Sequence, residues 1–241
     1  MKRAYYCYLS LFTFSYLISS CGPPLNSGKK ITTNTSVSSF SSVDIEAPVK
    51  TSIDIVKGAT PSLQITGPES QVKMIKYKVE GNALKLYTES NMHFDWDDDI
   101  VAHIVLPTIE GVNMGGAGST DITGIIAADS FSIDISGVGK VNIASVNVKT
   151  LYAEVSGAGK LNIKSGKAET CTYELSGTGY IDAFNVQAGN AAASVSGAGY
   201  INLSALQSLT SDISGVGTVR YKGHPVVTSS SSGVGRLSDA N

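Results

Sequence analysis

The chain has 241 residues, of which 16% are charged and 25 are glycine, and its formal net charge is −2. This mildly acidic balance argues against a nucleic-acid partner, which would need a basic face for the phosphate backbone. The hydrophobic share of 42% is enough for a core, which excludes disorder over most of the chain, and the length fits one large all-β domain or two small ones.

Residues 1–20 have the features of a bacterial lipoprotein signal peptide. Lys2 and Arg3 precede a mostly apolar stretch, 5–18, that is too short to span a bilayer permanently. Small residues then lead to Cys21 in a pattern that resembles a lipobox, so we expect lipid attachment at Cys21. The alternative is an ordinary secretory signal with an incidental cysteine. The lipoprotein interpretation predicts a membrane-anchored protein of the cell envelope, in the outer membrane, and leaves the side of the membrane open.

The next two segments differ in composition. Residues 21–38 are rich in Pro, Gly, Ser, Thr and Asn without an apolar period, which predicts a flexible tether. Over 39–110, apolar residues such as Val43 and Ile45 alternate with polar ones, which is typical of half-buried strands. Gly81-Asn82 lies between two such runs and predicts a hairpin turn. We expect this N-terminal β region to contain no helix.

From residue 111 to 241 the chain repeats a Ser-Gly-x-Gly phrase. The first glycines of the seven units are Gly116, Gly137, Gly157, Gly177, Gly197, Gly215 and Gly233. Their period is near 20 residues, and strand-type alternation lies between them, which indicates a β-solenoid. We expect seven coils of three short strands, in which the glycines turn the chain at one corner because glycine accepts positive φ and leaves room for the next coil. The preceding serine would settle the bend by a local hydrogen bond.

The alternation around each corner also predicts which side chains face the interior. Before the glycines these are Ile133, Ile135, Ala153, Val155, Tyr173, Leu175, Ala193, Val195 and Ile213. After the glycines they are Val141, Ile143, Leu161, Ile163, Ile181, Ala183, Ile201, Leu203 and Val219. A less regular third segment would close each coil with Val146, Val148, Val186, Ala188, Leu206 and Leu209.

These repeats resemble a family of bacterial envelope proteins, the putative auto-transporter adhesin, head GIN domain. The stretches LQITGPESQVKMIKYKVEGNALKLY (63–87) and IVAHIVLPTIEGVNMGGAGSTDI (100–122) carry the resemblance as well, which covers 39–241. It implies a right-handed parallel β-helix with a β-rich N-terminal part and an adhesive function, and it supplies no catalytic or binding residues. The last two repeats are shorter, with Arg220 in place of Asn or Asp and serines at 230–232, so we expect a fraying or capping end.

Stacked coils turn each repeat position into a column of side chains. One outward column would hold Asp134, Glu154, Glu174, Ser194 and Asp212. Three successive acids repel one another unless they are screened or bridged, so Asp134, Glu154 and Glu174 form a possible cation column, for Ca²⁺ for example, or a set of catalytic carboxylates. The simpler interpretation is a solvated face.

Two further columns would lie beside it. Lys140, Lys160, Tyr180 and Tyr200 form a possible ligand face, because two stacked tyrosines beside lysines can bind a sugar ring; the alternative is pairing that only stabilises the sheet. The other column would form a structural ladder of side-chain amides, and it consists of Asp121, Asn142, Asn162, Asp182, Asn202 and Arg220.

The remaining motifs give little chemistry. HFDWDDD (93–99) contains the one tryptophan, Trp96, among aspartates, and could bind a cation or present the aromatic ring to a ligand. The simpler interpretation is a flexible hairpin loop, and the run lacks the spacing of a calcium loop. His93, His103 and His224 share no metal-ligand spacing, and His103 lies in an apolar strand and is expected to be a packed residue. Cys171 remains as a lone cysteine in the mature chain, expected to be a small strand residue. We expect no cofactor and no metal.

The leading functional hypothesis is a non-enzymatic envelope lipoprotein whose rigid β-helical surface serves adhesion, or binds a glycan or an envelope or host protein. One alternative is a polysaccharide lyase or hydrolase that uses the stacked carboxylates, because fold alone does not decide function. Another is a structural or sensory envelope module without a ligand of its own. We expect a monomer, with the N-terminal β region covering one end of the solenoid and the polar tail blunting the other.

Overall fold

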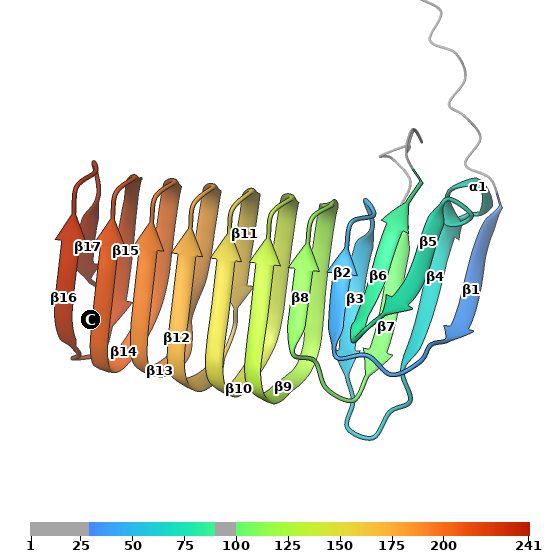
Figure 1. The fold of residues 1–241 in the computed structure, drawn as a ribbon, viewed down its shortest axis with the longest axis horizontal. Helices are drawn as coiled ribbons and strands as arrows, with labels where there is room; N and C mark the ends of the chain where they lie inside the picture. Colours follow the sequence, from blue (N-terminus) through green and yellow to red (C-terminus); the bar gives the residue numbers. More distant parts are fainter. Residues whose placement is uncertain (1–28, 90–99) are drawn as a thin grey trace, which may run out of the picture.

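The structure, a computed structural model, describes residues 29–89 and 100–241 and is almost entirely β. Its strands join into one continuous sheet that winds into a rod (Figure 1). The N-terminal strands are β1 (Lys30–Ser36), β2 (Ser42–Ile45), β3 (Lys50–Ile55), β4 (Ser62–Pro68), β5 (Ile75–Glu80), β6 (Ala83–Thr88), β7 (Val101–Leu106) and β8 (Gly111–Met114). The repeat contains β9 (Ala117–Ile135), β10 (Val138–Val155), β11 (Ala158–Ile163), β12 (Gly166–Leu175), β13 (Thr178–Val195), β14 (Ala198–Ile213), β15 (Val216–Lys222), β16 (Val226–Ser231) and β17 (Arg236–Asp239).

The repeat region forms a parallel β-solenoid of about 6 turns with about 20 residues per turn. The expected number of seven coils was therefore too high, since seven corners enclose six complete turns. Residues at equal positions of successive coils pair in register, as Val138 does with Ala158 and Glu154 with Glu174. The longest strands, such as β9, β10 and β13, continue around the bends of a coil, so backbone hydrogen bonds bind neighbouring coils on every side of the rod.

The interior columns confirm the predicted pattern of alternation. Every residue predicted to face inward beside the corners is buried, as are Val146, Val148, Val186, Ala188 and Leu209 of the third segment. Leu206 is the exception, because its side chain is 55% exposed. Its coil is two residues shorter than the one before, and the register shifts between Asp182 and Gln187, so that Ala188 pairs with Ala205. Ala205 therefore takes the interior position that the sequence pattern assigned to Leu206.

Backbone contacts hold each corner of the solenoid. The N–H groups of Ser156 and Gly157 both donate to the Ile135 carbonyl of the preceding coil, and the other corners repeat this pattern. A Cβ on Gly157 would overlap the Gly137 carbonyl oxygen, so the first glycine is required for the close approach of coils. Positive φ occurs at the second glycine of some units, such as Gly199 at 152°. The serine hydrogen bond that we expected is absent, since no corner serine bonds through its side chain within the described residues.

The N-terminal region continues the same rod. β2 and β3 pair in parallel with β8 and β9, and β4 runs antiparallel to β7 and β1 at the end of the rod (Figure 1). The predicted hairpin is confirmed, because β5 and β6 pair antiparallel across Gly81, whose φ is 59°.

Two expectations for this region were wrong. The tether prediction for 21–38 fails over β1, whose polar side chains pair with those of β4: Gln64 Nε2 donates to Asn34 Oδ1 at 2.6 Å. The expected absence of helix fails at α1 (Glu69–Val72), a single turn that packs Val72 into the core. No helix in the described part of the chain is long and apolar enough to cross a membrane.

Candidate functional site

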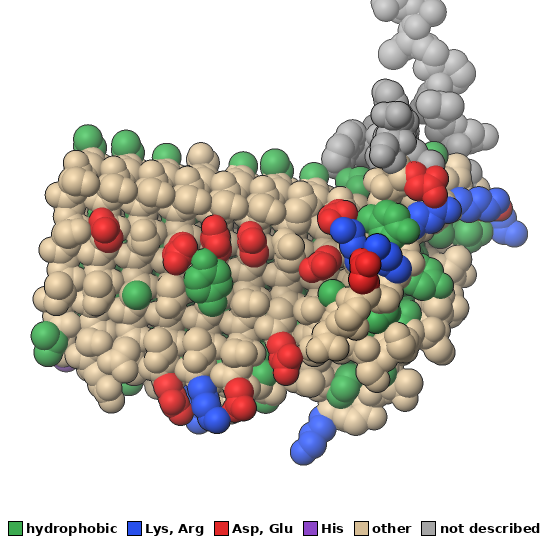
Figure 2. All heavy atoms as spheres, viewed as in Figure 1, with side chains coloured by type: hydrophobic (Ala, Val, Ile, Leu, Met, Phe, Trp, Pro, Cys, Tyr) green, Lys and Arg blue, Asp and Glu red, His purple; other side chains and the backbone are tan. Residues whose placement is uncertain are grey.

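Two surfaces of the rod carry opposite charge. The strand segments that follow the corners present an outward surface that we call the basic face. Its ionisable side chains are the cations Lys140, Lys160, Lys164, Arg220, Lys222 and Arg236 and the acids Asp121 and Asp182. The segments that precede the corners present the acidic face, whose acids are Asp134, Glu154, Glu174 and Asp212. Figure 2 shows these acids as a row across the coils.

The predicted ligand column lies on the basic face with the expected pairing. Lys140 pairs with Lys160, Lys160 with Tyr180, and Tyr180 with Tyr200. The two tyrosine rings stack with their centroids 4.9 Å apart and their planes 3° from parallel. The Arg220 guanidinium lies over the Tyr200 ring, 5.5 Å from its centroid. Because the rings cover one another and Arg220 covers Tyr200, the pair presents mainly its edges and hydroxyls rather than an open ring face.

A second cation is held in the same way further along this face. The Lys222 ammonium lies 4.6 Å from the centroid of the Phe184 ring. Sequence reasoning identified the two tyrosines but missed Phe184 and Lys222. They are outward residues two positions after Asp182 and Arg220 in their coils, so the period of two that located the columns could have placed them.

The residues of the predicted amide column do lie in line along the rod, and one pair of neighbouring side chains in it forms a hydrogen bond. Asn142 Nδ2 donates to Asp121 Oδ1 at 2.7 Å. Further along, Asn162 pairs in register with Asp182, and Asn202 pairs with Arg220. The Oδ1 atom of Asn202 is buried and has no hydrogen-bond partner within the described residues. A continuous ladder of amide hydrogen bonds is therefore not formed, and the column is held together by its backbone.

On the acidic face, the predicted column is extended at one end. Asp134 pairs with Glu154, and Glu154 with Glu174, as expected. The column continues into the N-terminal region through Asn113 and Asp44. Sequence reasoning treated the repeat separately and so missed these two residues, which the parallel pairing of β2, β8 and β9 brings into line.

Tyr152 connects two acids of this column. Its hydroxyl lies 2.8 Å from Glu154 Oε2 and 3.1 Å from Glu174 Oε2. Burial and these two bonds raise the pKa of Tyr152, so it stays protonated and donates to the carboxylates. Sequence reasoning missed Tyr152, although it lies two residues before Glu154 and therefore on the same face. The phenol offers an alternative to a bridging cation for reducing the repulsion between these acids.

Asp134 lies at the edge of a hollow of about 240 Å³ between the N-terminal region and the first coils, with Tyr152, Asn113 and Asp44 also in its wall. Burial and then the charge of Glu154 raise the pKa of Asp134. One oxygen of this carboxyl, Oδ1, is buried without a hydrogen-bond partner in the described residues.

Within residues 29–89 and 100–241, no group of three or more His, Cys, Asp or Glu side chains is arranged to hold a metal ion. A lyase would also need a base near the acids. Lys85 pairs in register with Asp44 at the N-terminal end of the column, whereas the strand segments 131–135, 151–155 and 171–175 carry no Lys or Arg. The raised pKa of Tyr152 also disfavours a phenolate base.

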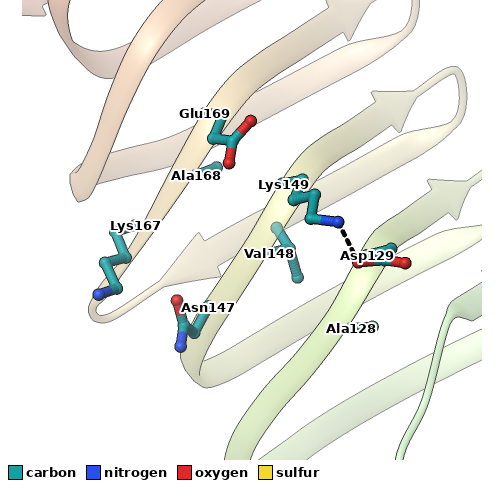
Figure 3. A pocket seen from close by; sticks show the side chains of 8 residues that line it. All are labelled: Ala128, Asp129, Asn147, Val148, Lys149, Lys167, Ala168 and Glu169. Atoms are coloured by element: carbon teal, nitrogen blue, oxygen red, sulfur yellow. Dashed lines mark ion pairs between the residues drawn. The ribbon is translucent and has the colours of Figure 1, made fainter.

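A larger hollow, of about 460 Å³, lies along the bend opposite the corners. Lys149 Nζ forms an ion pair of 2.8 Å with Asp129 there, and Glu169 follows in the next coil (Figure 3). Alternating charges at one level of successive coils stabilise the stacking, so we interpret this edge as structural.

His103 has a polar partner that the sequence did not reveal. Its Nε2 lies 2.8 Å from Asp54 Oδ2, and Thr123 Oγ1 donates to Asp54 Oδ1 at 2.6 Å. The bonds from Thr123 and His103 lower the pKa of Asp54. His103 is half-exposed rather than packed in the core, because its strand turns this side chain outward. Trp96, His93 and the rest of 93–99 lie outside the described residues, as does Cys21.

The fold and its surfaces define a class of protein: a rigid parallel β-solenoid with charged and aromatic columns on its faces and a β-rich cap at one end. Residues 39–225 match the family model of the putative auto-transporter adhesin, head GIN domain, and the chain belongs to this family.

Solved structures agree with this assignment. A putative adhesin from Bacteroides fragilis is 29% identical, with a TM-score of 0.85 over 88% of this chain and 97% of that one. A putative lipid binding protein from Parabacteroides distasonis shares the fold, with 21% identity and a TM-score of 0.68 over 89% of this chain and 98% of that one. No protein of curated function matches the chain. The family name, a putative adhesin, indicates a surface or envelope location, which agrees with the expectation of a cell-envelope protein.

Proposed function

We propose that this protein is a lipid-anchored, non-catalytic protein of the cell envelope that uses its rod for adhesion or for binding a ligand or partner. The observation that carries the proposal is the Tyr180–Tyr200 stack with Arg220 over it. These groups project from a backbone whose register is fixed by hydrogen bonds on every coil, so they are preorganised for a partner. The family assignment and the similarity to a putative adhesin of Bacteroides fragilis support an adhesive role, and the sequence around Cys21 supports the anchor.

The basic face favours a glycan over a purely apolar partner. Tyrosine hydroxyls, asparagine amides and lysine ammonium groups are donors for sugar hydroxyls and ring oxygens. An envelope or host protein is the other class of partner that this surface can serve.

A glycan retention assay tests the proposal. The full chain, purified in detergent, is applied to immobilised glycans of bacterial and host origin, with and without Ca²⁺. Bound material and new reducing or unsaturated ends are both measured. Retention without new ends is the expected result. Replacement of Tyr180 and Tyr200 by alanine should weaken retention at least about tenfold, as for aromatic residues at the centre of an interface. Tyr152→Ala on the acidic face is the matched control and should leave retention unchanged.

The other outcomes separate the alternatives. New chain ends would contradict a non-catalytic role and would favour a lyase or hydrolase, for which the Glu154–Tyr152–Glu174 arrangement is the candidate site. A result with no retention and no cleavage would contradict glycan binding and would favour a structural or sensory module.

A further inference from the structure

The cations of the basic face have no acidic partner among the described residues. Elsewhere, Lys73, Lys78, Lys85 and Lys149 each form an ion pair with a nearby carboxylate. In the described part of the chain, none of the six cations of the basic face lies within ion-pair distance of an acid. The six cations outnumber the acids Asp121 and Asp182 of the same face, so this face carries a net positive charge.

The unpaired cations lie on both sides of the aromatic residues. Lys140 and Lys160 come before the tyrosine stack along the rod, and Arg236 comes after it in the same column. From Lys140 to Arg236 the column crosses five register steps, which at the strand spacing of about 4.8 Å is about 24 Å. Arg220 and Lys222 are restrained by the rings of Tyr200 and Phe184, which lowers the entropy lost when they bind an anion.

Given the proposed binding function, on which this step rests, we infer that the basic face binds an acidic polysaccharide whose chain lies along the axis of the rod. Carboxylate or sulfate groups of the sugar accept charge-assisted hydrogen bonds from the lysines and from Arg220. The tyrosine hydroxyls and the amides of Asn142 and Asn162 meet the sugar hydroxyls between the charges. An extended polymer can engage several successive coils, so weak individual contacts add up to useful avidity.

The negative charge of the acidic face restricts the proposed binding to one side of the rod. Asp134, Glu154 and Glu174 repel the same polymer, and the strand segments that carry them, 131–135, 151–155 and 171–175, hold no Lys or Arg. A polyanion is therefore held on one side of the rod alone.

The experiment compares polygalacturonate with its methyl ester, which has the same sugar chain without the charge. Binding of the full chain in detergent is measured by biolayer interferometry at increasing NaCl. We expect polygalacturonate to bind at least about tenfold more tightly than the ester, and to weaken as salt rises because exposed charges are screened beyond about 8 Å at physiological ionic strength.

Two double variants remove the same number of charges from different places. Arg220→Gln with Lys222→Gln should weaken binding of polygalacturonate about tenfold, as the loss of two exposed charge contacts predicts. Lys149→Gln with Lys167→Gln, at the bend opposite the corners, should change it less than about twofold. All four side chains are on the surface, and equal melting temperatures of the two variants will show that the fold is kept.

Equal binding of polygalacturonate and its ester, or equal losses in the two double variants, would overturn the inference. Retention of neutral glycans by all variants alike would leave the proposed function standing while this inference fails. Absence of binding to every glycan would contradict both. Binding of phosphatidylglycerol vesicles through Arg220 and Lys222, without binding of polygalacturonate, would show that the face serves a membrane instead.

Discussion

At the scale of single residues, the phenol of Tyr173 lies beside the thiol of Cys171 in the interior of the rod. Tyr173 and Cys171 are both fully buried. Burial raises the pKa of the Cys171 thiol to about 11, so it stays protonated. Cys171 lies in β12, which confirms the expectation of a small strand residue. No nitrogen or oxygen atom of the described residues bonds the Tyr173 hydroxyl. A thiol is a weak partner for such a group, so the hydroxyl adds little to stability.

Removal of this hydroxyl should therefore be tolerated. We predict that Tyr173→Phe changes the free energy of unfolding by less than about 1 kcal/mol, or stabilises the protein, because an unsatisfied buried hydroxyl is lost. Tyr173→Ala is the contrast and should cost about 3–5 kcal/mol through the cavity that it leaves. Urea unfolding of both variants is the measurement, and a large loss in Tyr173→Phe would show that the hydroxyl has a strong partner.

Two aspartates should respond to pH with opposite sign. Burial and Glu154 raise the pKa of Asp134 above its ordinary 3.8, so its ionisation opposes folding at pH 7, and this cost is absent below pH 3.8. Asp134→Asn should therefore stabilise the protein at pH 7 and not at pH 3.

Asp54 is the control for this pH dependence. Thr123 and His103 lower its pKa, so its charge stabilises the fold above pH 3.8, and that contribution is lost as the pH falls through the lower, folded-state pKa. Asp54→Asn should destabilise the protein at pH 7 and have less effect in acid. Urea unfolding at both pH values measures the two variants, and a shift of the same sign at pH 7 would contradict the assignment.

At the scale of strands and corners, the repeat depends on close approach of glycine backbones. Gly157 lies against the Gly137 carbonyl of the previous coil, while the adjacent Ser156 is exposed and bonds only through its backbone. The conserved spacing of the phrase within this chain thus reflects packing of one coil on the next, and it is the first glycine that packing requires.

The corner offers a direct comparison of neighbouring residues. We predict that Gly157→Ala lowers the free energy of unfolding by about 3 kcal/mol, at the upper end for overpacking, because its Cβ meets backbone that cannot move aside. Ser156→Ala should change it by less than about 0.5 kcal/mol. Thermal unfolding followed by circular dichroism measures both, and equal effects would mean that the serine side chain supports the corner after all.

At the scale of the whole molecule, the ends of the rod set its association state. Antiparallel strands β1 and β4 lie at one end, and at the other end the outermost strands β16 and β17 pair with β14 and β15 and carry mostly polar side chains. Because polar side chains on an edge strand disfavour pairing with another chain, we predict a monomer. Light scattering over a range of protein concentrations tests this, and a stable end-to-end dimer would contradict it.

The anchor is tested separately from the fold. We predict that the chain labels with radioactive palmitate and sediments with membranes when it is expressed in a Gram-negative host. Cys21→Ser should abolish the label and move the protein to the soluble fraction, because acyl chains bind the bilayer through about 0.8 kcal/mol per methylene. Cys171→Ser is the control and should still be labelled, since Cys171 is buried in the rod.

The sequence alone determined the solenoid, its period and most of its core, because stacked coils force equal positions into line, so spacing along the chain predicts columns such as Lys140, Lys160, Tyr180 and Tyr200. Tertiary structure decided what spacing cannot encode. Arg220 lies over Tyr200, Tyr152 bridges two acids, and Asp54 pairs with His103, because these contacts depend on side-chain conformation and on coils from separate parts of the chain. The exposure of Leu206 was also decided by the tertiary structure. Its coil is two residues shorter than the one before, and only the pairing with the neighbouring coil determines which of its side chains then face inward.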